Sequence, residues 1–208
     1  MTSTTLSDAE RFWAGEFGAG YRERNTGAAL VAARCALFSK VLGSCAPIHS
    51  AIELGANIGN NLKALRILLP HAELTGVEIN AESARLLAAI PTINAVNASL
   101  LGFRLGSPAD LSFTAGVLIH IPPADLPDAY AALYENARRY ILVAEYYNPT
   151  PVEIPYRGHS GKLFKRDFAG ELLDRYPNLR LRDYGFCYRR DPVFPMDDGT
   201  WFLLEKQG

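Results

Sequence analysis

Short apolar runs alternate with longer amphipathic segments from residue 48 to the end of the chain. A continuous apolar run is typical of a strand buried on both faces, and an amphipathic segment is typical of a helix that covers such a strand. Regular alternation of the two indicates parallel strands with helices packed on both faces of the sheet. The pattern therefore predicts an α/β sandwich of three layers.

The alternation predicts a sheet of seven strands. Strands are expected over residues 48–54, 73–78, 93–97, 111–115, 140–145, 179–188 and 200–205. Helices are expected over residues 61–69, 81–89, 125–138 and 167–176. The last two strands are expected to form a hairpin at the sheet edge, so the predicted sheet is mostly parallel with an antiparallel last strand. This is a Rossmann-like arrangement.

A single domain over residues 1–208 is expected, with 1–47 as an N-terminal helical cap and 48–208 as the core. Ser7 is the expected N-cap of a short first helix, and residues 27–42 form a second. We expect Phe12 and Trp13 to pack in the core, with folding over a bound ligand as the alternative. Proline and glycine break the pattern at residues 148–166, which are expected to form a substrate loop.

Composition and charge argue against several classes of protein. The chain has 21 basic and 22 acidic residues, which argues against a surface built for nucleic acid or anionic lipid. Its 3 cysteines lack paired spacing, so reduced thiols are expected. The N-terminus lacks the pattern of a secretory signal, and no apolar run approaches the length of a membrane span, so a cytoplasmic protein is expected. The 4 histidines are scattered, and no metal site is expected.

The turn after the first strand carries the strongest local signal, because Gly55 and Gly59 would let the backbone approach a ligand at a helix N-terminus. The dinucleotide motif G-x-G-x-x-G is incomplete here, since Asn57 stands at its second glycine position. Glu53 precedes the turn, and Glu78 ends the second strand, where a carboxylate can accept both hydroxyls of a ribose. A tight turn without a ligand, with Glu78 capping the next helix, is the alternative.

These residues resemble the first motif and the acidic second-strand end of the class I S-adenosylmethionine-dependent methyltransferases. The resemblance covers about residues 48–208 and implies S-adenosylmethionine as the cofactor. It implies that Glu53 holds the cofactor amino group and that Glu78 binds the ribose hydroxyls. Where the family usually has Asp near the adenine, this chain has Ser99. The cofactor-binding residues implied are Glu53, Gly55, Asn57, Gly59, Glu78, Ile79, Asn97, Ala98, Ser99, Gly116 and Tyr21.

A closer resemblance appears when later segments are included. The chain resembles the methylases associated with pseudaminic acid biosynthesis, a family whose name does not establish what is methylated. The segments that carry this resemblance are 12–13, 21–25, 116–122, 144–149, 156–168 and 197–202.

Polar residues follow strands four and five, where ligands bind in open α/β sheets. His120 is a candidate general base that takes a proton near neutral pH, although it could instead pack or cap a turn. Tyr146 is a candidate catalytic phenol, with sheet-edge packing as the alternative. Tyr147 and Asn148 are candidate hydrogen-bonding partners of a polar substrate.

Residues 156–166 hold four cations and no acidic residue. Arg157 could clamp a carboxylate or phosphate with two parallel hydrogen bonds, and flexible glycines could let the segment act as a lid. A solvated basic loop is the alternative. The expected substrate-binding residues are Arg24, Tyr147, Asn148, Tyr156, Arg157, His159 and Lys162.

The function predicted is methyl transfer from S-adenosylmethionine to a small anionic metabolite: a sugar, a nucleotide sugar, or an amino or keto acid. A NAD-dependent oxidoreductase and a non-catalytic cofactor-binding protein are the alternatives. A nucleic-acid methyltransferase is disfavoured, because 116–119 lacks the N-P-P-Y type tetrad of base-flipping enzymes. The sequence leaves the oligomeric state open.

Overall fold

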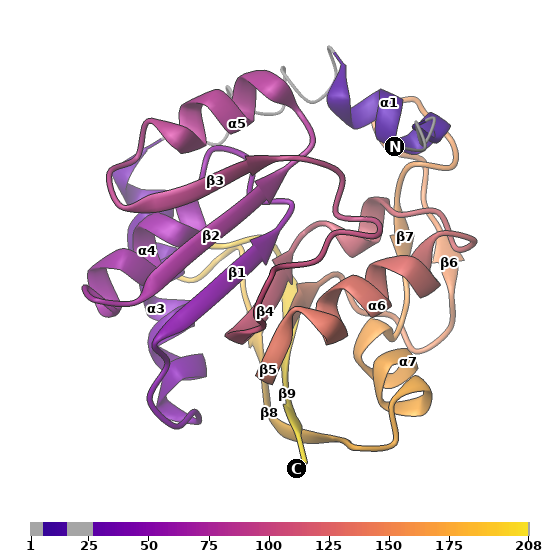
Figure 1. The fold of residues 1–208 in the computed structure, drawn as a ribbon. Coiled ribbons are helices and arrows are strands. Elements are labelled where there is room, and N and C mark those ends of the chain that lie inside the picture. Colours follow the sequence, from indigo (N-terminus) through magenta and orange to yellow (C-terminus); the bar gives the residue numbers. More distant parts are fainter. Residues whose placement is uncertain (1–5, 16–26, 208) are drawn as a thin grey trace.

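A computed structural model describes residues 6–15 and 27–207 of the chain. Seven strands of the described residues form one sheet in the order β3-β2-β1-β4-β5-β9-β8 (Figure 1). The strands are β1 (Ser50–Leu54), β2 (Glu73–Glu78), β3 (Ile93–Asn97), β4 (Ala109–Ala115), β5 (Ala137–Glu145), β8 (Leu179–Cys187) and β9 (Gly199–Lys206). The first five pair in parallel, and β9 is antiparallel to both β5 and β8. The predicted mostly parallel sheet with an antiparallel last strand is confirmed.

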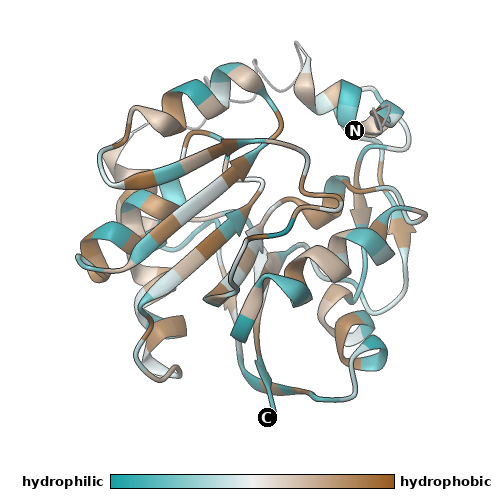
Figure 2. Ribbon diagram, viewed as in Figure 1, coloured by the Kyte–Doolittle hydropathy of each residue, from teal (hydrophilic) through white to brown (hydrophobic). Residues whose placement is uncertain are grey.

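Helices cover both faces of the sheet and complete the three layers (Figure 1). One apolar cluster joins one face to α3, α4 and α5, and a second joins the other face to α6 and α7. Each of these helices carries hydrophilic and hydrophobic positions, as expected of a helix with one covered face (Figure 2). The helices are α3 (Ala28–Gly43), α4 (Asn60–Leu68), α5 (Ala81–Ala88), α6 (Leu126–Glu135) and α7 (Phe168–Arg175). Among the described residues, no helix is long and apolar enough to cross a bilayer.

The first helix, α1 (Asp8–Ala14), lies beyond the carboxyl ends of the strands (Figure 1). Ser7 caps it as predicted: its side chain accepts a hydrogen bond from the backbone of Glu10, whose carboxylate accepts one from the Ser7 backbone in return. Phe12 and Trp13 are only partly buried and do not belong to either core cluster, so the prediction of core packing is wrong. Both face loops at the carboxyl ends of the strands, because a helix placed there has no sheet face to cover.

The segment predicted as a loop, 148–166, contains a small antiparallel ribbon of β6 (Val152–Glu153) and β7 (Phe164–Lys165). Its tip is a two-residue hairpin turn at Arg157 and Gly158, with φ of 50° and 85°. Positive φ at both positions is the geometry of a type I′ turn. Gly158 therefore belongs to a tight turn, and the expected action of this segment as a lid stays a prediction.

Buried Asn136 fixes the long connection between β3 and β4. Its Oδ1 accepts a hydrogen bond from the Leu105 backbone at 2.7 Å, and its Nδ2 donates to the carbonyls of Phe103 and Ala132 at 2.9 and 2.8 Å. This connection begins at the carboxyl end of β3. Asn136 thus helps to hold a loop that lies beside α1.

Replacing Asn136 with alanine should lower the free energy of unfolding by about 3 kcal/mol, because three buried hydrogen bonds are lost and their partners stay buried. Denaturant titration followed by circular dichroism measures the change. Asn94→Ala is the matched control, since Asn94 is exposed and makes one long contact of 3.5 Å with Thr75. Equal effects of the two substitutions would contradict this role of Asn136.

Candidate functional site

The turn between β1 and α4 brings backbone unusually close to its neighbours. Gly55 and Gly59 have φ of 84° and 78°. A Cβ on Gly55 would lie 2.6 Å from the side chain of Val117 and one on Gly59 2.5 Å from that of Leu87, so neither position has room for a side chain. Asn57, which stands at the middle glycine position, also adopts a left-handed conformation with φ of 48°. Asparagine tolerates this conformation better than most residues, which explains how the turn forms without a glycine at the middle position.

Glu78 at the end of β2 holds this turn. Its Oε2 accepts a hydrogen bond from the backbone N–H of Asn57 and its Oε1 one from that of Asn80, both at 2.8 Å. Burial raises the pKa of the carboxyl above its usual value, and these hydrogen bonds oppose the rise. A carboxylate has about four acceptor sites, so one stays open beyond these donors and the backbone of Ile79. Glu78 can therefore hold the loop and still accept a hydrogen bond from a ligand.

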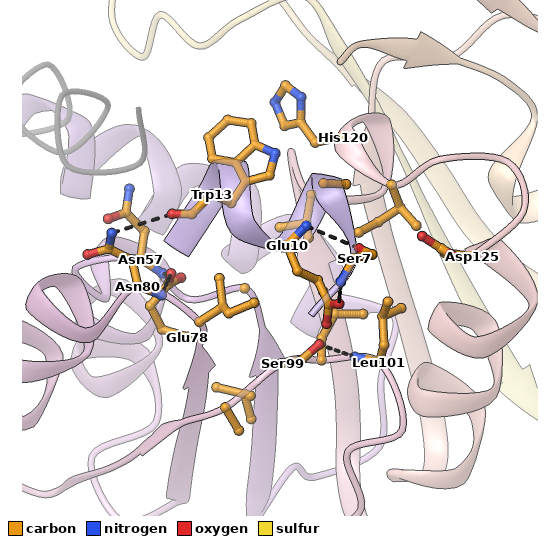
Figure 3. Close-up of a pocket in the computed structure, with 18 of the residues that line it drawn as sticks. Ser7, Glu10, Trp13, Asn57, Glu78, Asn80, Ser99, Leu101, His120 and Asp125 are labelled. Carbon is orange, nitrogen blue, oxygen red and sulfur yellow. Dashed lines mark hydrogen bonds between the residues drawn. The ribbon is translucent and has the colours of Figure 1, made fainter. Parts of the chain in front are cut away.

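A cavity opens at the carboxyl ends of β1, β2 and β4, with α1 as one wall (Figure 3). Seven of the residues expected to bind the cofactor line it: Gly55, Asn57, Glu78, Ile79, Ala98, Ser99 and Gly116. The neighbouring lining residues from α1 are Ser7, Ala9, Glu10 and Trp13. Most of the remaining wall is apolar, with Val77, Leu100, Leu101, Val117, Ile121 and Pro122.

Three other expected cofactor residues lie outside this lining. Gly59 packs under α5, and Asn97 points its Nδ2 at the carbonyls of Glu78 and Ile79, where it supports the end of β2. The third is Glu53, in β1. Tyr21, and Arg24 among the expected substrate-binding residues, lie outside the described residues.

Glu53 is buried in β1, with 1% of its surface exposed. Asn61 donates a hydrogen bond of 2.6 Å to its Oε1, while its Oε2 is buried without a hydrogen-bond partner. Burial raises the pKa of Glu53 to about 8, so the carboxyl is mostly protonated at neutral pH. A neutral carboxyl is a weaker partner for a ligand ammonium than the carboxylate that the resemblance implies.

A second, larger cavity adjoins the first. Gly116 and His120 line both cavities, so they stand where the two meet. Of the expected catalytic and substrate residues, Tyr146, Tyr156 and Arg157 also line the second cavity. Its other charged lining residues are Arg34, Glu145, Arg189 and Asp197.

His120 lies in the short helix η1 (Leu118–His120), between the rings of Trp13 and Tyr156, whose centroids are 4.4 and 5.1 Å from its own. Its Nδ1 lies 2.7 Å from the carbonyl oxygen of Lys162. A carbonyl only accepts, so Nδ1 carries the proton and Nε2 keeps its lone pair. Burial lowers the pKa of His120 to about 4, which corrects the prediction that this ring takes a proton near neutral pH.

Glu145, at the end of β5, holds the loop that carries His120, a role that the sequence did not suggest. Its carboxylate accepts hydrogen bonds from the backbone N–H groups of Val117 and Leu118 at 3.0 and 3.1 Å, and a longer one from Ile119 at 3.4 Å. These donors are the unpaired groups at the start of a helix. Burial raises the pKa of Glu145 to about 7, against the effect of these bonds.

The residues after β5 divide between the cavity and the surface. The hydroxyl of Tyr146 donates a hydrogen bond of 3.1 Å to Asp197, and both residues line the second cavity. The side chain of Tyr147 is directed away from it, packing on Phe202 with ring centroids 5.8 Å apart. Asn148 is half-buried, and its Nδ2 donates a hydrogen bond to the Thr150 carbonyl. The alternation of side chains along an extended strand accounts for the split.

The four cations of 156–166 are more dispersed than expected. Arg166 pairs with Glu171 at 2.7 Å, Lys165 lies over the ring of Tyr146, and Lys162 lies over that of Phe12. Arg157 is exposed at the hairpin tip and lines the second cavity.

His159 is also exposed and packs against the ring of Phe12, with centroids 5.3 Å apart. Among the described residues, no group of three His, Cys, Asp or Glu side chains could hold a metal ion.

Asn80 is a further residue at the first cavity that pattern reasoning did not assign to it, whereas Trp13 takes the alternative position, over a ligand site, that the sequence left open. Asn80 is the N-cap of α5, and its Nδ2 donates towards the carbonyl oxygens of Trp13, Ala14 and Gly15 at 3.4, 3.0 and 3.3 Å (Figure 3). The N-cap position could be read from an asparagine before an amphipathic segment. Its contact with a helix far away in the chain could not.

No protein-family model matches the chain, and no curated protein sequence matches it. Among solved structures, the fold is similar to that of the 1,6-didemethyltoxoflavin N1-methyltransferase of Burkholderia thailandensis, with a TM-score of 0.70 and 14% identity over 100% of this chain and 94% of that chain. A sugar N-methyltransferase of a Streptoalloteichus species matches with a TM-score of 0.67 and 14% identity, over 100% of this chain and 98% of that chain. An amino pentose methyltransferase of Micromonospora echinaspora matches with a TM-score of 0.65 and 10% identity, over 100% of both chains. The chain has the fold of these methyltransferases.

The substitution Glu53→Gln should stabilise the protein increasingly as the pH rises. The folded-state pKa of about 8 lies above the ordinary 4.5, so the wild type loses stability as the pH rises from 4.5 to about 8. Glutamine removes this titration and retains an acceptor for Asn61. The gain should be near zero at pH 4.5 and reach at most about 5 kcal/mol above pH 8, at 1.36 kcal/mol per pKa unit.

Denaturant titrations of both proteins at several pH values measure this difference. Glu145 titrates in both proteins and cancels, whereas the charge of Glu78 contributes to the raised pKa of Glu53, so this interaction is part of the difference measured. A difference that stays constant with pH would show that Glu53 ionises normally.

Proposed function

We propose that this protein is an S-adenosylmethionine-dependent methyltransferase that acts on a small anionic molecule. The observation that carries the proposal is the junction of two cavities at Gly116 and His120. A methyl transferase must hold a donor and an acceptor in separate pockets whose reacting atoms meet. The solved structures with this fold include methyltransferases crystallised with S-adenosylmethionine or S-adenosylhomocysteine bound.

The residues of the first cavity fit such a donor. Asn57 has a buried Oδ1 without a hydrogen-bond partner, and a Cβ placed on Gly116 would meet no atom within 4 Å, so this part of the wall is open. Glu78 offers an acceptor for a ribose hydroxyl beside them. Ile79 and Ala98 offer an apolar slot for an adenine, and the backbone near Ser99 offers groups that can pair with its edge.

When bound, the cofactor would supply a methyl group bonded to a positively charged sulfur. The role of the chain is then mainly to align the acceptor and to exclude water. Glu145 fixes the loop between the cavities, and Trp13 and Tyr156 enclose His120. The Nε2 lone pair of His120 accepts a hydrogen bond from the acceptor's O–H or N–H and orients it. With a pKa of about 4, this ring is a weak base that remains neutral at pH 7.

The charges of the second cavity favour an anionic acceptor. Arg34, Arg157 and Arg189 line it, and Arg189 also pairs with Asp198 at 3.3 Å. The two carboxyls of the lining have partners, since Glu145 binds backbone N–H groups and Asp197 binds Tyr146. A guanidinium such as that of Arg157 matches a carboxylate or phosphate through paired hydrogen bonds. Tyr146 offers a phenol that can bind a polar group near the junction. We propose a sugar, a nucleotide sugar, or an amino or keto acid as the acceptor, in keeping with the resemblance to the methylases associated with pseudaminic acid biosynthesis.

Titration calorimetry with S-adenosylhomocysteine and with NAD tests the donor. The wild type should bind S-adenosylhomocysteine and not NAD. Glu78→Ala should weaken binding by about 100-fold, because the hydrogen bond to its carboxylate and its hold on the loop are lost. Glu82→Ala is the control, since Glu82 lies on α5 and pairs with Arg85 on the surface. NAD binding without S-adenosylhomocysteine binding would favour an oxidoreductase.

Mass spectrometry of reactions with labelled S-adenosylmethionine and a panel of acidic metabolites and nucleotide sugars tests the transfer. One labelled product is expected. His120→Ala should slow its formation by about 100-fold, because the acceptor loses the hydrogen bond that orients it, and change S-adenosylhomocysteine affinity only a few-fold. Donor binding without any labelled product from the panel would favour a non-catalytic cofactor-binding protein.

A further inference from the structure

We propose that Asn80 is a positioning residue that fastens α1 over the first cavity and thereby sets Trp13 against His120. The side chain of Asn80 is buried, with 5% of the residue exposed. It joins two helices that are distant in the sequence. The part of the proposal that concerns the cofactor rests on the proposed function, whereas the fastening of α1 does not.

The side-chain amide of Asn80 forms hydrogen bonds with otherwise unpaired backbone groups at the start of α5 and at the end of α1. The Oδ1 of Asn80 accepts a hydrogen bond of 3.0 Å from the backbone of Ser83, which caps the N-terminus of α5. Its Nδ2 points at the last carbonyls of α1, with Ala14 at 3.0 Å as the nearest. A helix C-terminus leaves carbonyls without partners, and a short helix has few other means to satisfy them. The positive end of α5 and the negative end of α1 also attract each other across this residue.

The backbone of Asn80 is itself fixed, because its N–H donates to Glu78. The position of α1 is therefore tied to the carboxylate that is proposed to bind the ribose. At its other side, α1 touches the segment that carries the second cavity: Lys162 lies over the ring of Phe12, 4.6 Å from its centroid. Helix α1 thus connects the two proposed binding regions.

The position of α1 affects both the enclosure of the first cavity and the position of the His120 ring. Trp13 lines the first cavity and packs on His120 with centroids 4.4 Å apart, so it is part of the wall where the cavities meet. If α1 moved away, this wall would open and the ring of His120 would lose a neighbour. A ligand in the first cavity would then leave more quickly.

Two substitutions separate this role from helix capping. Serine at position 80 still caps α5 but has no amide to donate. Aspartate also caps α5 and adds a favourable charge at its N-terminus, but its carboxylate would face the carbonyls of α1. If Asn80 only stabilised α5, Asn80→Asp would be harmless. If it fastens α1, Asn80→Asp should be at least as damaging as Asn80→Ser. Asn94→Ser, at an exposed site, is the control.

Acrylamide quenching of tryptophan fluorescence gives a readout that needs no ligand. The chain has 2 tryptophans, and Trp201 is 4% exposed, so a change in quenching reports mainly on Trp13. Both Asn80 variants should increase the quenching constant at least about twofold. Stopped-flow displacement should show S-adenosylhomocysteine leaving about tenfold faster, as expected for the loss of one to two hydrogen bonds from the closed wall.

Unchanged quenching in both variants, with the fold intact by circular dichroism, would overturn the proposal. Increased quenching with an unchanged dissociation rate would overturn its cofactor part. If the wild type bound no S-adenosylhomocysteine, the proposed function and the cofactor part would fail together, while the quenching result would still decide whether Asn80 holds α1.

Discussion

The site depends on two buried carboxyl groups. Each stands at the end of one strand and accepts hydrogen bonds from the backbone of the loop that follows the neighbouring strand. Glu78 on β2 holds the loop that follows β1, and Glu145 on β5 holds the loop that follows β4. Because β1 and β4 are adjacent at the centre of the sheet, the two carboxylates secure the central loops from either side. This is the point where an open α/β sheet binds its ligand. Removing charge from water is unfavourable, and the hydrogen bonds from several N–H groups offset part of that cost.

Most of the fold follows from the sequence because it depends on local pattern. The strands 73–78 and 93–97 have their predicted bounds, and the others begin or end within a few residues of them. Buried parallel strands are continuous apolar runs, and the helices between them end at proline or at clear caps. The ribbon β6 and β7 was missed because strands of two residues leave no periodic pattern. Phe12 and Trp13 were misplaced because an apolar residue facing a cavity has the same sequence signal as one facing a core.

The candidate site was predictable in its first cavity and much less so in its second. Gly55, Asn57 and Glu78 lie in one short turn and one strand end, so their spacing in the sequence already brings them together. The second cavity combines residues from α3, the β5 end, the hairpin and the loop before β9. No spacing rule connects such residues. The pKa of His120 was also unpredictable, because it reflects burial between two aromatic rings rather than the residue type.

The position of β9 has a consequence for how the chain is made. The last strand lies between β5 and β8, and pairs with both along most of its length. Until a ribosome has released residues 199–206, neither β5 nor β8 can pair with β9, and the β5 edge that β9 will cover stays open to other strands. The N-terminal side of the sheet can form earlier, since β1 to β5 pair among themselves. Synthesis therefore passes through a stage with an exposed, strongly apolar edge, when association with other chains is a greater risk than at any later time.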